Sequence, residues 1–191
     1  MCVYLLCLSM ALGAAGCGTD KKAEETGKQE VTEQNNDNME NRVTFLGKDM
    51  EGNEVNSAEL FAGHKITMVN VWATFCSPCI RELPDLEELN REIEADGMQV
   101  VGILSDAGYM DGNYDESILE LGKNILEEKG VHYTNVMCDI SSFQEQVVID
   151  AVPTTFFVDE QGNIVGQIQV GTVSKEEYKT LAKQALEEAQ E

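Results

Sequence analysis

Residues 72–79 read WATFCSPC, and the rest of the chain is interpreted outward from this stretch. A mostly apolar run, KITMVNVWA, leads into it and predicts a buried strand. Apolar residues at helical spacing follow it and predict a helix that begins at Ser77 and ends near Ala95. Two cysteines at such a strand–helix junction can bind a metal, close a structural disulfide or exchange electrons, and their spacing alone leaves all three uses open.

The position of the two cysteines favours electron exchange. Cys76 lies at the predicted helix N-terminus, where the helix dipole and unpaired N–H groups stabilise a thiolate. Pro78 falls in the first turn, where the N–H that proline lacks would have no helical partner. We therefore expect Cys76 to be an exposed nucleophile and Cys79, one turn deeper, to be the shielded resolving thiol.

A second motif, AVPTTF at 151–156, directly precedes another predicted strand. A proline at this point predicts a tight turn, and an X–Pro bond is the peptide bond that most readily becomes cis. From the residues alone, the isomer of the Val152–Pro153 bond and its distance from Cys76 stay open.

Strands and helices alternate from Arg42 onward. The segment 43–55 predicts a β-hairpin with its turn at 51–53. Further strands are predicted at 98–105, 134–140 and 154–171, the last divided by a turn at 160–163, and further helices at 57–61, 117–128, 141–148 and 174–189. This alternation predicts an α/β fold whose last two strands form an antiparallel edge. Cys138, at the end of one predicted strand, is expected to be a buried free thiol.

WATFCSPC, followed further along by AVPTTFFVDEQGNIVG, resembles the thioredoxin superfamily. The hairpin GKDMEGNEV and the apolar start of the chain resemble its extracytoplasmic TlpA/ResA-like branch, and the resemblance covers roughly residues 42–191. It implies a thioredoxin-like fold, with a central mixed β-sheet flanked by helices and an N-terminal β-hairpin extension. It also implies a redox-active Cys76–Cys79 disulfide and a cis Pro153 beside it, with the substrate pairing with the backbone at Val152.

Two positions near the cysteines concern proton transfer. Asn70 stands where thioredoxin has a buried aspartate, and an amide cannot accept the proton that Cys79 must lose. Glu82, three residues after Cys79, lies on the same helix face, and the ResA-like branch has a glutamate at this spacing. We predict that Glu82 accepts and donates this proton; the alternative is a surface acid that interacts only with the helix dipole.

Residues around the cysteines and Pro153 are expected to contact the substrate, and Pro153 itself is counted with the catalytic residues. Phe75 replaces the tryptophan that the family commonly has before the first cysteine, which alters the rim of the site. The predicted substrate-binding set is Phe75, Ser77, Pro78, Val152 and Thr154.

The N-terminus predicts an address outside the cytosol. Residues 1–16 are uncharged and largely apolar, as in a signal peptide, and small residues before Cys17 resemble a bacterial lipoprotein signal with an acylated cysteine. The alternative is a plain cleaved signal. Residues 17–41 are predicted to be a disordered acidic tether, and 42–191 the thioredoxin-like domain. The formal net charge of −22 argues against nucleic-acid binding.

These features predict a thiol–disulfide oxidoreductase, anchored to the outer face of the bacterial membrane, that reduces disulfides of exported proteins. The predicted partners are those substrates, a membrane-embedded thiol electron donor and the lipid membrane. No cofactor beyond the disulfide and no metal is predicted, since His64 and His132 lack ligand spacing to the cysteines.

Three alternatives remain. The same chemistry could run as a disulfide-forming oxidant. A thioredoxin-fold copper-binding assembly protein would space its cysteines by three residues rather than two. A peroxiredoxin-like peroxidase would have threonine where Ala73 stands.

Overall fold

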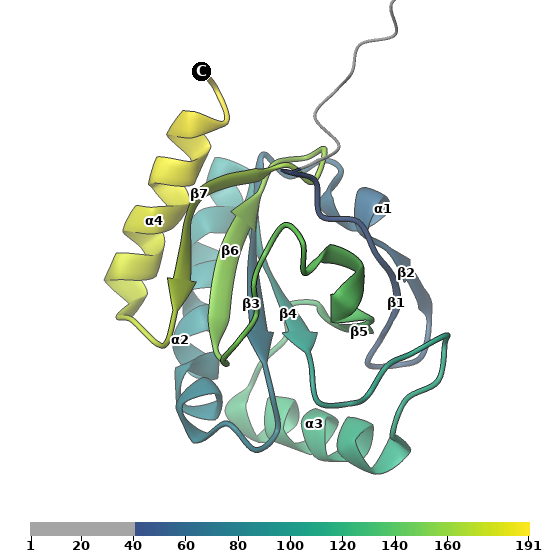
Figure 1. Cartoon of the computed structure of the whole chain (residues 1–191). Coiled ribbons are helices and arrows are strands. Elements are labelled where there is room, and N and C mark those ends of the chain that lie inside the picture. Colours follow the sequence, from purple (N-terminus) through teal and green to yellow (C-terminus); the bar gives the residue numbers. More distant parts are fainter. Residues whose placement is uncertain (1–40) are drawn as a thin grey trace, which may run out of the picture. The chain divides into compact units, whose positions relative to one another are not determined.

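A seven-stranded mixed sheet forms the centre of the computed structural model, which describes residues 41–191 (Figure 1). The strand order is β2-β1-β5-β4-β3-β6-β7. Three parallel strands lie in the middle: β3 (Ile66–Trp72), β4 (Met98–Leu104) and β5 (Asn135–Cys138). β6 (Thr154–Val158) pairs antiparallel with β3, and β7 (Ile164–Val170) forms the antiparallel edge that the sequence predicts.

The predicted hairpin extends the other side of this sheet. Its strands β1 (Leu46–Asp49) and β2 (Glu54–Asn56) pair antiparallel, and β1 also pairs antiparallel with β5. The connecting turn places Gly52 at a φ of 90°, a conformation that favours glycine. The carboxylate of Asp49 accepts hydrogen bonds from the backbone N–H groups of Glu51 and Asn53 and so closes the turn.

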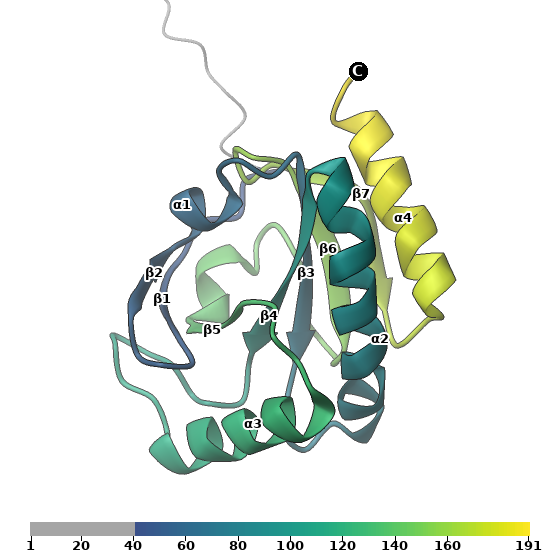
Figure 2. The ribbon, with the colours of Figure 1, turned by 180° about the vertical axis from the view of Figure 1, so that it is seen from behind.

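Both faces of the sheet are covered. The helices α2 (Ser77–Ile93), α3 (Glu116–Lys129) and α4 (Lys175–Glu188) contribute to the core on one face (Figure 2). The short helix α1 (Ser57–Phe61) and a 3₁₀ turn at Ile140–Phe143 contribute to the core on the other face. Because β3 lies between these two cores, every one of its residues is buried, in agreement with its mostly apolar sequence.

The helices around the site begin where the sequence predicts. The Ser174 hydroxyl accepts a hydrogen bond from the backbone N–H of Glu177 and caps α4. α2 continues through Pro84 to Ile93 and ends in a 3₁₀ turn at Glu94–Asp96. Cys138 is a buried free thiol, as expected, and burial raises the pKa of this thiol above its ordinary range.

One predicted helix differs. Residues 141–148 do not form an α-helix: a 3₁₀ turn at Ile140–Phe143 is followed by a single further turn, in which Val147 bonds back to Phe143. Phe143 and Val147 are fully buried, so these two short turns are enough to place both side chains in the core. The carboxylate of Asp139 caps the turn by accepting the N–H of Ser141.

The predicted signal peptide 1–16, Cys17 and all of the predicted tether before Asn41 lie outside the described residues. The side-chain amide of Asn41 donates to the carbonyl of Ile164, so residue 41 already contacts the domain. Within residues 41–191, none of the helices combines the length and apolar character needed to cross a bilayer.

Candidate active site

The two cysteines lie where the central strand β3 passes into α2, and they form a disulfide. Cys76 is the N-cap of α2: its Sγ accepts a hydrogen bond from the backbone N–H of Cys79 over 3.2 Å. Pro78 occupies the first turn, as predicted. An N–H group and the helix dipole therefore point at the sulfur that is to become a thiolate on reduction.

The two sulfurs differ in access, although less than the sequence suggests. Cys79 is fully buried, whereas Cys76 is 6% exposed and so is not the openly exposed residue that we expected. The reason is the approach of a second loop: Sγ of Cys76 lies 3.5 Å from the carbonyl oxygen of Val152. Cys76 remains the more accessible of the two, in keeping with its expected role in attack.

The loop that covers Cys76 contains the Val152–Pro153 peptide bond, which is cis. The two motifs that the resemblance linked are therefore in contact. Pro153 is buried, and the hydroxyl of Thr154 donates to the carbonyl of Ala151 over 2.7 Å. Because the Thr154 side chain is fully buried, it shapes this loop and does not offer a side-chain surface to a substrate.

The other predicted contact residues lie at the surface beside the disulfide. Phe75 is 75% exposed, Ser77 is exposed, and Pro78 and Val152 are half-buried. The Phe75 ring is thus an exposed apolar surface beside the disulfide.

The loop before Cys76 is held by a carboxylate that the sequence did not single out. Asp106, after β4, accepts hydrogen bonds from the backbone N–H of Thr74 at 3.0 and 3.1 Å and from its hydroxyl at 2.6 Å. Beneath the loop, Trp72 is fully buried and its indole N–H donates to Asn135. Trp72 is thus a packing residue, and Asp106 fixes the loop that precedes Cys76.

Glu82 is buried at 5% exposure, which contradicts the alternative of a surface acid. Its Oε1 accepts a hydrogen bond from the side-chain amide of Asn70 on β3, and its Oε2 accepts one from the hydroxyl of Tyr178 on α4, each over 3.0 Å. The Asn70 amide also donates to the hydroxyl of Thr155 on β6. The only carboxylate in this network lies one turn after Cys79.

Burial raises the pKa of Glu82 from 4.5 to about 7. The hydrogen bonds from Asn70 and Tyr178 act in the opposite direction, because they stabilise the carboxylate, while the negative charge of Asp85 adds to the rise. A carboxyl group that titrates near neutral pH can take up and release a proton under the conditions of thiol exchange.

A second buried carboxylate, Glu87, fixes the segment that leads into β5. It accepts hydrogen bonds from the backbone N–H groups of His132 and Tyr133 at 2.7 and 3.1 Å and from the Arg91 guanidinium. Burial pushes the pKa of Glu87 up, but these hydrogen bonds outweigh it and hold the pKa below 4.5. Glu87 is therefore a charged structural group, in contrast to Glu82.

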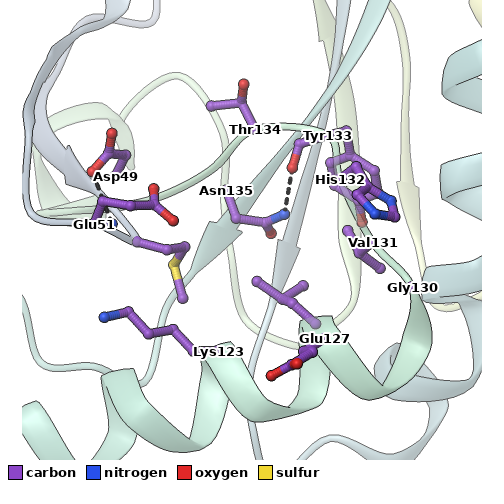
Figure 3. A pocket seen from close by; sticks show the side chains of 12 residues that line it. Asp49, Glu51, Lys123, Glu127, Gly130, Val131, His132, Tyr133, Thr134 and Asn135 are labelled. Atoms are coloured by element: carbon purple, nitrogen blue, oxygen red, sulfur yellow. Dashed lines mark hydrogen bonds between the residues drawn. The ribbon is translucent and has the colours of Figure 1, made fainter.

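A pocket of about 590 Å³ lies on another part of the domain, among the turn after β1, the C-terminal end of α3 and the residues before β5 (Figure 3). Asp49, Glu51, Lys123 and Glu127 contribute charges to its wall. Neither cysteine nor Glu82 lines it, so the redox site is separate from this pocket. Among residues 41–191, no cluster of three or more side chains suited to a metal ion occurs.

Tyr178 and Asp106 are the contacts that sequence reasoning missed. Tyr178 lies at the helical spacing of the apolar residues in the last predicted helix, and its partner Glu82 lies 96 residues away in the sequence. Asp106 follows a predicted strand without any motif of its own. The single available signal was a carboxylate at the end of a central strand next to β3, where parallel strands bring functional groups together.

Comparison with known proteins gives consistent results. The family model described as Redoxin matches residues 34–184. The chain is 26% identical over 178 residues to the thiol-disulfide oxidoreductase ResA of Bacillus anthracis, an alignment covering 92% of this chain and 88% of that protein. It is 30% identical to ResA of Geobacillus thermodenitrificans over 139 residues, 71% of this chain and 70% of that protein.

A solved structure agrees with the fold. The thiol:disulfide interchange protein of Chlorobium tepidum TLS superposes with a TM-score of 0.60 at 29% identity, covering 75% of this chain and 93% of that one. The superposition supports the mixed sheet with flanking helices and the N-terminal hairpin.

Proposed function

The chain belongs to the Redoxin family, and from this membership and the site geometry we propose that it reduces disulfide bonds of exported proteins through a Cys76–Cys79 dithiol–disulfide cycle. Its relatives are named thiol-disulfide oxidoreductases, and the chain is a ResA-like member of that class. The observation that carries the proposal is the disulfide at the start of α2, with one sulfur against the Pro153 loop and a buried carboxyl one turn behind the other.

The cycle begins with the reduced protein. The Cys76 thiolate attacks one sulfur of a substrate disulfide, so that a bond forms between Cys76 and the substrate while the substrate S–S bond breaks. The released substrate thiolate takes a proton from solvent. The N–H of Cys79, which points at Sγ of Cys76, stabilises the attacking thiolate before this step.

Release requires the second thiol. Cys79 gives its proton to the Glu82 carboxylate and attacks Sγ of Cys76; the Cys76–Cys79 bond forms, and the second substrate sulfur leaves as a thiolate. Two electrons have then passed from the protein to the substrate. Glu82 returns its proton to solvent or to the leaving thiolate, and a thiol electron donor, which we propose to be membrane-embedded, reduces the disulfide for the next cycle.

The substrate binds, in this proposal, beside Cys76. Its backbone pairs with the chain at Val152 by strand addition, with Pro153 beneath the disulfide, and its side chains contact Phe75, Ser77 and Pro78. The exposed ring of Phe75 supports this arrangement, since it provides apolar area at the rim.

We also propose that residues 1–16 are removed as a signal peptide and that acylated Cys17 anchors the protein to the outer face of the bacterial membrane through the tether 17–41. Metabolic labelling with a fatty-acid analogue tests this: label and membrane association are expected in the natural protein and are expected to be lost in Cys17→Ser. Label retained in Cys17→Ser would refute the anchor at this residue.

The direction of exchange is tested by two measurements on the purified protein. Reduced protein is expected to cleave the interchain disulfides of insulin, and its reduction potential, measured against glutathione, is expected nearer to the −270 mV of thioredoxin than to the −120 mV of DsbA. A potential above about −150 mV would indicate the disulfide-forming oxidant instead. Inability to reduce insulin or another disulfide substrate would reject the proposed activity.

A further inference from the structure

The carboxyl group of Glu82 is held from two sides by elements far apart in the sequence. Asn70 on β3 donates to Oε1, and Tyr178 on α4 donates to Oε2, each over 3.0 Å. Asn70, Glu82 and Tyr178 are all buried, two of them completely. Because each oxygen accepts one hydrogen bond, the carboxyl group is held in place between β3 and α4. One of these two donors comes from α4.

We propose that Tyr178 is a positioning residue for thiol exchange: its hydroxyl orients the Glu82 carboxyl group and stabilises the charged form that accepts the proton of Cys79. This inference rests on the proposed role of Glu82 as that acceptor. Tyr178 itself exchanges no proton in the cycle.

The chemistry of the phenol suits this task. Burial, and next the charge of Glu82, raise the pKa of Tyr178 above its ordinary value, so the hydroxyl keeps its proton and stays a donor at every pH at which thiols exchange. An isolated carboxylate in such a buried place would be strongly disfavoured. The hydrogen bonds from Asn70 and Tyr178 lower the pKa of Glu82 against the effect of burial.

Other polar groups around Glu82 come from three directions. A hollow of about 180 Å³ that opens to solvent lies beside Glu82. Its wall includes Pro78, Arg81, Glu82 and Asp85 from α2, together with Thr172 and Val173. The charge of Asp85 raises the pKa of Glu82. In the segment before β5, burial and then the charge of Glu82 raise the pKa of Tyr133. Cys79 of the disulfide precedes Glu82 by one turn on α2.

Tyr133 provides a matched control. It is also a buried tyrosine near Glu82, but its hydroxyl has no hydrogen-bond partner among residues 41–191. Tyr133→Phe and Tyr178→Phe therefore each remove a hydroxyl from a buried tyrosine, and only the second removes a hydrogen bond to Glu82.

The first experiment follows the side-chain carboxyl carbon of Glu82 by ¹³C NMR during a pH titration of the oxidised full-length protein. In Tyr178→Phe the Glu82 midpoint is expected to rise by about one pH unit, because a lost hydrogen bond to a charged group is worth about that shift. In Tyr133→Phe the midpoint is expected to stay at its wild-type value. Equal midpoints in the wild type and both variants would overturn the proposal.

A second labelling keeps the test independent of any folding defect in Tyr178→Phe. Replacing all tyrosines by 3-fluorotyrosine makes each hydroxyl more acidic and hence a stronger donor. Fluorination is then expected to lower the midpoint of the Glu82 titration. It is expected to lower it in the Tyr133→Phe variant as well, because Tyr178 is still fluorinated there. A midpoint that does not respond to fluorination would show that no tyrosine hydroxyl stabilises the carboxylate, and would overturn the proposal.

Kinetics connects the hydrogen bond to the reaction. A model thiol is loaded on Cys76 as a mixed disulfide, and its release is followed across pH; the inflection assigned to Glu82 is expected to move upward in Tyr178→Phe. In a Glu82→Gln background, Tyr178→Phe is expected to add nothing. If the pH dependence of the release rate is the same in Glu82→Gln as in the wild type, neither Glu82 nor Tyr178 takes part in the reaction. If Glu82→Gln changes this pH dependence but Tyr178→Phe does not, Glu82 takes part and Tyr178 does not.

Discussion

Asn70 on β3 and Glu82 on α2 are directly hydrogen-bonded over 3.0 Å inside the core. From the sequence, Asn70 stands where thioredoxin has an acid, and Glu82 is predicted to take over the role of that acid. Their contact places the amide on β3 and the carboxyl group on α2 side by side in one buried hydrogen-bond network. An amide at position 70 supplies a donor, which a carboxylate could not do.

Replacing Cys79 by serine is expected to trap substrates on Cys76 as mixed disulfides, because attack on the substrate is intact while the resolving thiol is missing. Non-reducing electrophoresis with mass spectrometry measures the adducts. Cys76→Ser, which lacks the attacking sulfur, is the control and is expected to trap none. Equal amounts of trapped substrate in Cys79→Ser and Cys76→Ser would contradict the assignment of Cys76 as the attacking thiol and of Cys79 as the resolving thiol.

Glu82→Gln is expected to remove a pH dependence of stability in the oxidised protein. The pKa of Glu82 is raised in the folded state, so the folded protein favours the protonated carboxyl group, and stability is lost as the pH rises from about 4.5 through about 7. The rise corresponds to about 3 kcal/mol. Urea unfolding should therefore show the wild type losing roughly this amount relative to Glu82→Gln between pH 4 and pH 8. If the stability difference between the wild type and Glu82→Gln stays constant across this range, the pKa of Glu82 is not raised in the folded protein.

Asp106→Ala is expected to loosen the loop before Cys76, since Thr74 loses the acceptor of its N–H and hydroxyl groups. We expect a loss of about 1–2 kcal/mol in the free energy of unfolding and slower insulin reduction. Asp106→Asn keeps one acceptor oxygen, so its stability and its rate of insulin reduction should lie between those of the wild type and those of Asp106→Ala. Asp96→Ala, which changes an exposed acid in the 3₁₀ turn after α2, is the control. Full activity in Asp106→Ala would show that the loop is held without this carboxylate.

Glu87→Ala is expected to cost about 3 kcal/mol of stability at pH 7, because the N–H groups of His132 and Tyr133 lose their acceptor. The pKa of Glu87 lies below 4.5 in the folded state, so its contribution is full at neutral pH and is lost on acidification through that pKa. Glu88→Ala, next on the same helix but exposed and ion-paired with Lys175, should cost less than about 1 kcal/mol. Chemical denaturation at pH 7 measures the free energy of unfolding of both variants. Similar losses in Glu87→Ala and Glu88→Ala would contradict the structural role of Glu87.

Much of the fold follows from local patterns. The apolar run of β3, the helical spacing of α2 and the turn around Gly52 each depend on residues close in sequence, and each forms as predicted. The two cysteine and proline motifs are informative because their residue types are rare in combination. From them the sequence predicts the Cys76–Cys79 disulfide and the Pro153 loop beside it, which the structure brings into contact.

The remaining features depend on contacts between distant segments. The small exposure of Cys76 results from the approach of Val152, and the hydroxyl of Tyr178 has a partner only because α4 packs against α2. A helical stripe of apolar residues shows which face of α4 is buried, but it does not distinguish a tyrosine that packs from one that also donates. The short turn at Ile140–Phe143 likewise reflects two residues reaching the core together.

The docking of α4 has a consequence for biogenesis. The polypeptide is made from its N-terminus, so both cysteines, Asn70 and Glu82 are synthesised well before Tyr178. A nascent or truncated chain that stops short of the last helix contains the complete dithiol motif but only one of the two donors to the buried acid. Synthesis of the C-terminal helix is therefore the step that completes the environment of this acid.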